Sequence, residues 1–173
     1  IAAAWVAFRG GGWTPGMAHR IYRLDVVRHP EGVAGALRLA TSEDAALAMR
    51  WAVGFARDTG IDFPASEEAV GRWIRRESLF VWEVDGTPVS IAVAQGRTRS
   101  GARVGYVYTP PAWRGRGYAT ASVAALSQRL LDSGLDFTVL YTDLANPTSN
   151  SIYRRIGYNP IADVGDYTIL PER

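Results

Sequence analysis

The sequence contains no cysteine, and this absence excludes disulfide bonds, thiolate metal sites and a cysteine nucleophile. Histidine is scarce as well, because only His19 and His29 occur, ten residues apart and without metal-ligand spacing. No run of apolar residues approaches the roughly 20 that a membrane-spanning helix needs. We therefore expect no metal site and no membrane partner.

A strong excess of one charge is also absent. Lys and Arg total 19 and Asp and Glu total 17, which gives a net charge of only +2. Nucleic-acid-binding proteins concentrate positive charge, so this balance does not favour a nucleic-acid partner. Hydrophobic residues make up 47% of the 173 residues, an ordinary proportion for a globular domain with a sizeable core. The apolar residues 1–8 lack a basic lead and a clear cleavage site, so we expect a cytoplasmic protein.

The most informative stretch is a Gly-rich turn, residues 113–120 (WRGRGYAT), which follows a strand-like run at 102–109. An alanine-rich helical run follows it and ends near Ser133. The small residues let an anion approach the backbone N–H groups of the turn, and the helix that follows begins with unpaired N–H donors. Arg114 and Arg116 add positive charge. The stretch predicts a diphosphate site, and the alternative is a plain Gly-rich turn with two solvated arginines.

The rest of the chain alternates between helical and strand patterns. Residues 41–44 (TSED) have the form of a capping box, and Asp85-Gly86 predicts a hairpin turn. The predicted strands are residues 36–40, 79–84, 88–95, 102–109, 137–143 and 158–169, the last in one or two pieces broken at Gly165-Asp166. The predicted helices are residues 43–57, a helix opened by residues 66–68, then 118–133 and 148–155. This order predicts a mixed α/β fold with one crossover unit, and the apolar strand 137–143 should be central.

Residues 1–33 do not fit this pattern. Residues 1–8 could form a strand, residues 9–16 are interpreted as a loop because of their Gly and Pro content, and residues 19–27 alternate weakly as a strand does. We place a boundary near residue 33, with an N-terminal extension (1–33) before a domain of residues 34–173. The extension is either remnant strands of a degenerate preceding half-domain or a strand added at the sheet edge.

Two motifs, in order, resemble the GNAT superfamily of acetyl-CoA-dependent N-acetyltransferases. The family signature is Gln or Arg, two residues, Gly, one residue, then Gly or Ala, and residues 114–119 (RGRGYA) fit it. About thirty residues later, Asn146-Pro147 is followed by Tyr153 and then by Gly157-Tyr158. The resemblance covers about residues 34–173. It implies a GNAT fold of the α/β (α+β) class, in which about four helices flank a mixed central sheet of six to seven strands splayed at the acetyl-CoA cleft.

The resemblance also implies roles for individual residues. The backbone of Val107, Tyr108 and Thr109 should pair with the pantetheine arm of coenzyme A. Asn146 should hydrogen-bond the pantetheine, although an Asn-Pro pair can also simply form a turn. The pyrophosphate should be held by Arg114, Gly115, Arg116, Gly117, Tyr118, Ala119 and Thr120.

Tyr153 should lie near the thioester sulfur and act as the general acid that protonates the leaving thiolate. The alternative is a helix aromatic packed in the core. Many family members carry a Glu in or near the strand before the Gly-rich turn, and residues 102–109 contain no carboxylate. Glu83 and Asp143 are the candidate bases, and either is otherwise a solvated or hydrogen-bonded acid at a strand end. If neither carboxylate is the base, a water chain removes the proton from the amine, or the reaction relies on positioning and on the small fraction of neutral amine.

The sequence therefore predicts an N-acetyltransferase that moves an acetyl group from acetyl-CoA to a primary amine by direct attack in a ternary complex. The missing strand carboxylate favours an alternative, a non-catalytic acyl-CoA-binding module with the same fold. Nucleic-acid binding through Arg154, Arg155 and the arginines of the turn is disfavoured by the small net charge. The sequence leaves the acceptor open, and leaves open whether the chain forms a homodimer.

Overall fold

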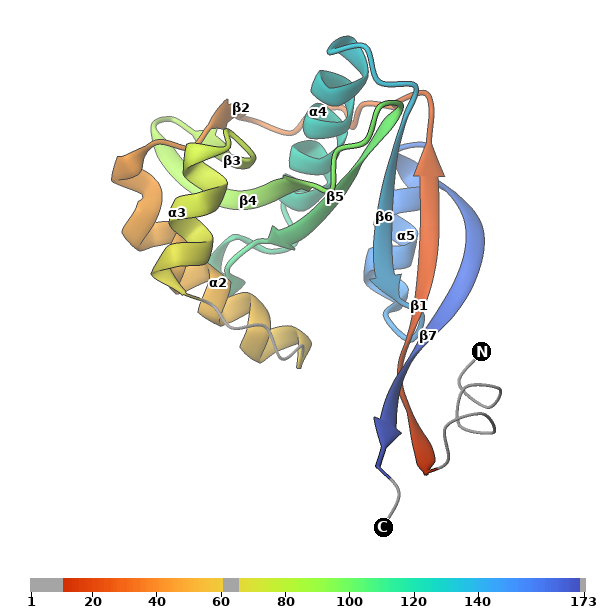
Figure 1. The fold of residues 1–173 in the computed structure, drawn as a ribbon. Helices are drawn as coiled ribbons and strands as arrows, with labels where there is room; N and C mark the ends of the chain where they lie inside the picture. The colour runs from red at the N-terminus through yellow and green to blue at the C-terminus, as the bar shows by residue number, and fades with distance from the viewer. Residues whose placement is uncertain (1–10, 61–65, 172–173) are drawn as a thin grey trace.

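The computed structural model describes residues 11–60 and 66–171, and this part of the chain forms a seven-stranded mixed sheet with four α-helices (Figure 1). Side by side, the strands are β2 (Ala36–Leu39), β3 (Leu79–Val84), β4 (Thr87–Gln95), β5 (Gly101–Tyr108), β6 (Phe137–Asp143), β1 (Gly12–Leu24) and β7 (Asn159–Leu170). The helices are α2 (Ala45–Thr59), α3 (Glu67–Arg75), α4 (Tyr118–Asp132) and α5 (Pro147–Arg155), with short 3-10 turns η1 (Ser42–Asp44) and η2 (Pro111–Trp113). The predicted fold class is confirmed. None of the helices in the described ranges is long and apolar enough to span a membrane.

Alternation along the strands places a hydrophobic core on each face of the sheet. Leu79 and Val81 of β3 pack on one face with residues of α2 and α3. Phe80, between them, points to the other face and packs with Val123 and Leu126 of α4. Successive strand residues point to opposite faces, so a single strand can hold helices on both sides of the sheet. Each large apolar side chain buried in this way stabilises the fold by roughly 1.5–3 kcal/mol.

The predicted capping box forms at η1, the 3-10 turn that leads into α2. The Thr41 hydroxyl accepts from the backbone N–H of Glu43 at 3.3 Å, and the Asp44 carboxylate accepts from the backbone N–H of Thr41 at 2.8 Å. Arg38 of β2 donates to both oxygens of the buried Asp44, at 2.8 and 2.9 Å. This hydrogen-bonded guanidinium holds the pKa of the Asp44 carboxyl below its usual value. The pair therefore joins α2 to the sheet edge.

β1 lies inside the sheet, between β6 and β7, and is antiparallel to both (Figure 1). The prediction of a loop at residues 9–16 is wrong where the structure describes this segment, because β1 begins at Gly12. The alternative that the extension adds a strand at the sheet edge is also wrong, because β7 occupies that edge. Pairing with β7 supports the Gly- and Pro-containing start of β1, where the Trp13 ring packs 5.1 Å from that of Tyr167. The break expected at Gly165-Asp166 is a register irregularity within one strand. The strand predicted at residues 1–8 lies outside the described residues.

β5 and β6 are parallel neighbours over only three residue pairs, from Gly101 with Phe137 to Arg103 with Val139. Gly101 permits the close approach there, because a Cβ at this position would meet the Phe137 ring. Farther along, β5 contains a bulge. Two residues separate Gly105 from Tyr108, whereas only one residue separates their partners Val93 and Ile91 on β4. Tyr106, in this bulge, has a φ of 53°. The two strands therefore separate, and the predicted splay of the sheet is confirmed.

We expect Asp44→Asn to lower the free energy of unfolding at pH 7 by about 1–3 kcal/mol, because it leaves buried donors without an ionised acceptor. This stabilisation comes from the ionised Asp44 carboxylate, whose pKa is lower in the folded state than in the unfolded state. It is therefore complete above the unfolded pKa of about 3.9 and is lost as the pH falls through the lower folded pKa. Urea unfolding of both proteins between pH 7 and pH 3 measures this. Asp132→Asn, on an exposed carboxylate, is the control, and a difference that stays constant below about pH 4 would contradict the assignment.

Candidate active site

A cavity of about 810 Å³ opens where β5 and β6 separate. Its walls come from the end of β5, the first turn of α4, one face of α5 along its whole length, the end of α2 and the connection between β1 and β2. Ten of the predicted cofactor-binding residues line it: Val107, Tyr108, Thr109, Arg114, Gly115, Gly117, Tyr118, Ala119, Thr120 and Asn146. A second cavity of about 810 Å³, near Arg129 and Ser133 at the other end of α4, is lined by none of the predicted site residues.

The Gly-rich turn presents open backbone donors to the first cavity. Gly115 and Gly117 have φ values of 77° and 82°, in the left-handed region that favours glycine. Gly117 is the N-cap of α4, and no side chain caps this end of the helix. The first N–H groups of α4 are therefore free to bind an anion, with the positive end of the helix dipole behind them.

Arg114 ties the Gly-rich turn to β5 and α2. Its Nε–H donates to the Thr109 carbonyl oxygen at 2.8 Å, and a terminal N–H donates to the Asp58 carboxylate at the end of α2. The Tyr108 hydroxyl also donates to Asp58, at 3.3 Å. Hydrogen bonding to Arg114 holds the pKa of the Asp58 carboxyl below its usual value. Arg114 therefore shapes the turn, whereas Arg116 lies over the Trp113 ring at 5.2 Å and does not line the cavity.

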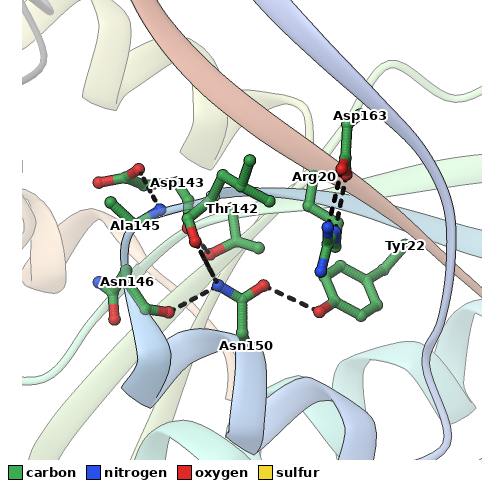
Figure 2. Close-up of polar contacts among 9 residues, drawn as sticks. Arg20, Tyr22, Thr142, Asp143, Ala145, Asn146, Asn150 and Asp163 are labelled. Carbon is green, nitrogen blue, oxygen red and sulfur yellow. Dashed lines mark hydrogen bonds and ion pairs between the residues drawn. The ribbon is translucent and has the colours of Figure 1, made fainter.

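Asn150, which the sequence reasoning missed, organises the start of α5. Figure 2 shows its side chain between the turn at Asp143–Asn146 and Tyr22 of β1. Its Nδ2 donates to the carbonyl oxygens of Asp143 and Asn146 at 3.1 and 2.7 Å, and its Oδ1 accepts from the Tyr22 hydroxyl at 2.8 Å. Asn146 itself caps α5 by accepting from the backbone N–H of Ser149 at 3.0 Å. Asn150 lies four residues after the N-cap Asn146, so its side chain can reach the Asn146 carbonyl oxygen, and this spacing is the sequence signal for the arrangement.

Tyr153, on α5, is half-buried and lies among aromatic side chains. Its ring centre lies 6.4 Å from that of Tyr22 and 6.1 Å from that of Tyr158. Burial raises the pKa of the Tyr153 hydroxyl, and Tyr158 adds to the effect. Tyr153 does not itself line the cavity, but Ile152 and Ile156 of the same helical stretch do.

Both candidate bases are held in other contacts. Glu83 of β3 accepts a hydrogen bond from Arg38, on the side of the sheet near β2. Asp143 ends β6, and its carboxylate accepts from the backbone N–H of Ala145 at 2.9 Å (Figure 2). Within the described ranges, Asp58 is the only carboxylate that lines the cavity, and it is bound by arginines.

We expect Gly117→Val to weaken binding of coenzyme A about tenfold or more. The new Cβ would lie 3.0 Å from a methyl group of Val33, at a φ that a branched residue resists, and would obstruct the anion approach. Gly134→Val is the matched control, since Gly134 has a φ of +90° and no atom within 4 Å of its added Cβ. Calorimetric titration of both folded variants measures the effect, and equal affinities would contradict it.

The family model described as Acetyltransferase (GNAT) family matches residues 45–158. A comparison with curated proteins finds no match. Among solved structures, the chain is similar to a GNAT-family acetyltransferase from Colwellia psychrerythraea, with a TM-score of 0.71 and 15% identity over 98% of this chain and 61% of that one. It is also similar to a GCN5-related N-acetyltransferase from Kribbella flavida, with a TM-score of 0.65 and 22% identity over 98% of this chain and 64% of that one.

A GCN5-related N-acetyltransferase from Sphaerobacter thermophilus gives a TM-score of 0.69 and 19% identity over 98% of this chain and 56% of that one. This chain thus spans about three fifths of the length of these structures, and at these identities the likeness is one of fold. The match to the family model is of a different kind, since it covers well over half of the chain and includes both the Gly-rich turn and the first turn of α5. The chain belongs to the GNAT acetyltransferase family.

Proposed function

We propose that this protein transfers an acetyl group from acetyl-CoA to a primary amine, by direct attack within a ternary complex. One observation carries the proposal: the uncapped N-terminus of α4 borders a cavity that opens beside a stretch of β5 whose edge toward β6 is unpaired. The helix end supplies N–H groups for a diphosphate. Beyond Arg103, β5 has no pairing with β6, so its backbone can bond the amides of a pantetheine arm as a neighbouring strand would.

The reaction requires that charge be stabilised at the thioester and that a proton reach the sulfur. The amine nitrogen attacks the carbonyl carbon, the new C–N bond forms, and the C–S bond breaks to release coenzyme A as a thiolate. A backbone N–H near Val107, in the bulged part of β5, is the proposed donor to the carbonyl oxygen. Tyr153 is the proposed proton donor because a phenol is protonated at neutral pH and its neighbours on the helix, Ile152 and Ile156, line the cavity.

The proton on the attacking amine must also leave. Of the two carboxylates proposed as the base, Asp143 ends β6 at the open side of the splay, whereas Glu83 lies on β3 in an ion pair with Arg38. We favour Asp143 of the two on this ground. Because its carboxylate already accepts from Ala145, a water chain or the neutral fraction of the amine is the alternative route.

We assign this activity to residues 34–173 together with β1 and the connection that follows it, because β1 lies inside the sheet and the connection lines the cavity. Tyr22 supports this arrangement, because it is fully buried in the main core and bonds Asn150 at the start of α5.

A second candidate function is a non-catalytic acyl-CoA-binding module. It is favoured by the lack of a free carboxylate on the described cavity wall. Titration with acetyl-CoA and an acetyl-transfer assay on a panel of primary amines separate the two functions. Transfer to any amine supports the enzyme, and tight binding without transfer supports the module.

We expect Tyr153→Phe to lower kcat by about 10²–10⁴-fold, the usual contribution of a general acid. The affinity for coenzyme A should not change, because the ring and its packing remain. Steady-state acetyl-transfer kinetics and calorimetry measure the two quantities. Tyr141→Phe on β6, where the side chain is 49% exposed, is the control. An unchanged kcat in Tyr153→Phe, or an equal loss in the control, would remove Tyr153 from the chemistry.

A further inference from the structure

The second cavity, at the end of α4 away from the Gly-rich turn, has a cationic rim. The arginines that line it are Arg72 and Arg76 at the end of α3, Arg97 in the turn between β4 and β5, and Arg129 in the last turn of α4. Within the described residues, Glu77 is the only carboxylate on its wall. A cavity lined mainly by charges of one sign concentrates the electrostatic field inside it, so this cavity attracts anions.

Most of this positive charge is not neutralised by the protein. Arg72 pairs with Glu68 at 3.3 Å, one helical turn away. In the part of the chain that the structure describes, the other three arginines of the rim form no ion pair. Basic side chains in the last turn of a helix offset the negative end of its dipole, and this role is sufficient to explain Arg72 and Arg129. It does not explain Arg97, which lies on a turn between two strands.

The floor of the second cavity is apolar. Phe80 and Leu130 line it, and the Arg129 guanidinium carbon lies 5.5 Å from the centre of the Phe80 ring. Leu39 and Ala94 line it as well and are only half-buried, so apolar surface remains open to a ligand. The volume of about 810 Å³ is within the range of pockets that hold small molecules. A cationic rim above an apolar floor suits an anion that also has an uncharged part.

We propose that the second cavity binds a phosphorylated small molecule, with its phosphate groups on Arg76 and Arg97 and its uncharged part over the apolar floor. Guanidinium groups bind phosphate through paired, charge-assisted hydrogen bonds, and their fork geometry matches phosphate oxygens. A phosphate held by both arginines would join the end of α3 to the turn between β4 and β5.

This site is separate from the cavity proposed for acetyl-CoA and does not rest on that proposal. The two cavities lie at opposite ends of α4, which has 15 residues and is therefore about 22 Å long. Ligands can then occupy both cavities at once. The first cavity also contains arginines, namely Arg28, Arg114 and Arg155, so the experiment must show which cavity a phosphorylated probe enters.

The chain offers matched controls for both arginines of the proposed site. Arg75 precedes Arg76 directly, and Arg99 lies two positions after Arg97 on the same turn. Both control residues are exposed, and neither lines the cavity. Replacing any of these arginines by Gln changes the net charge by the same amount. Arg97 also donates to the Ser133 hydroxyl at 3.2 Å, so thermal unfolding of each variant is needed to confirm that it is folded.

The experiment titrates the whole chain with ATP by calorimetry, with and without excess coenzyme A, and repeats the titration with adenosine and with inorganic triphosphate. We expect ATP to bind equally well with coenzyme A present, inorganic triphosphate to bind more weakly than ATP, and adenosine to give no measurable binding. Arg76→Gln and Arg97→Gln should each weaken ATP binding about tenfold or more. Arg75→Gln and Arg99→Gln should leave it unchanged.

Four results would overturn the assignment. Absence of binding by both ATP and inorganic triphosphate would show that the cavity does not recognise phosphate. Loss of ATP binding when coenzyme A is present would place the probe in the first cavity. An equal loss in Arg75→Gln or Arg99→Gln would show a general effect of charge. Adenosine binding as tight as that of ATP, or triphosphate binding as tight, would remove the arginines or the apolar floor, respectively, from the site.

Discussion

The separation of β5 from β6 is the constraint on which the rest of the site depends. Two parallel strands in a sheet normally satisfy each other's backbone groups along their whole length. Here they pair over three residue pairs, with Gly101 against Phe137 at the closed end. The bulge at Tyr106 then turns β5 away. The edge of β5 that β6 leaves unpaired and the uncapped end of α4 border the same cavity, so a single distortion of the sheet brings an open strand edge and an open helix end together.

Local patterns were sufficient to predict the elements around this opening. The predicted limits of β5, β6 and α4 agree with the structure to within one residue, because glycines, prolines and periodicity act over a few neighbours. The place of β1 could not be predicted in the same way. Its partners, β6 and β7, lie more than a hundred residues away, and the strand pattern itself carries no information about which strands will pair with it.

The site residues also divide into those placed by local sequence and those placed by contacts between distant segments. Residues of the Gly-rich turn line the cavity because their own backbone conformation puts them there, as the positive φ values of Gly115 and Gly117 show. Arg28 and Asn150 depend instead on how distant segments pack, through the bond from Arg28 to Ile156 and the bond from Tyr22 to Asn150. Glu83 illustrates the converse, since its carboxylate is taken up by Arg38 of a strand that only the sheet register brings close.

The interior position of β1 also affects how the chain reaches its native state. Tyr22 pairs with Leu140, 118 positions later, so this part of the sheet closes only after the residues up to β6 have been synthesised. Contacts between residues so far apart raise the contact order, and a high contact order slows folding because a long loop must be closed first. Until β7 is synthesised, the side of β1 that pairs with it would remain an open edge available to other chains.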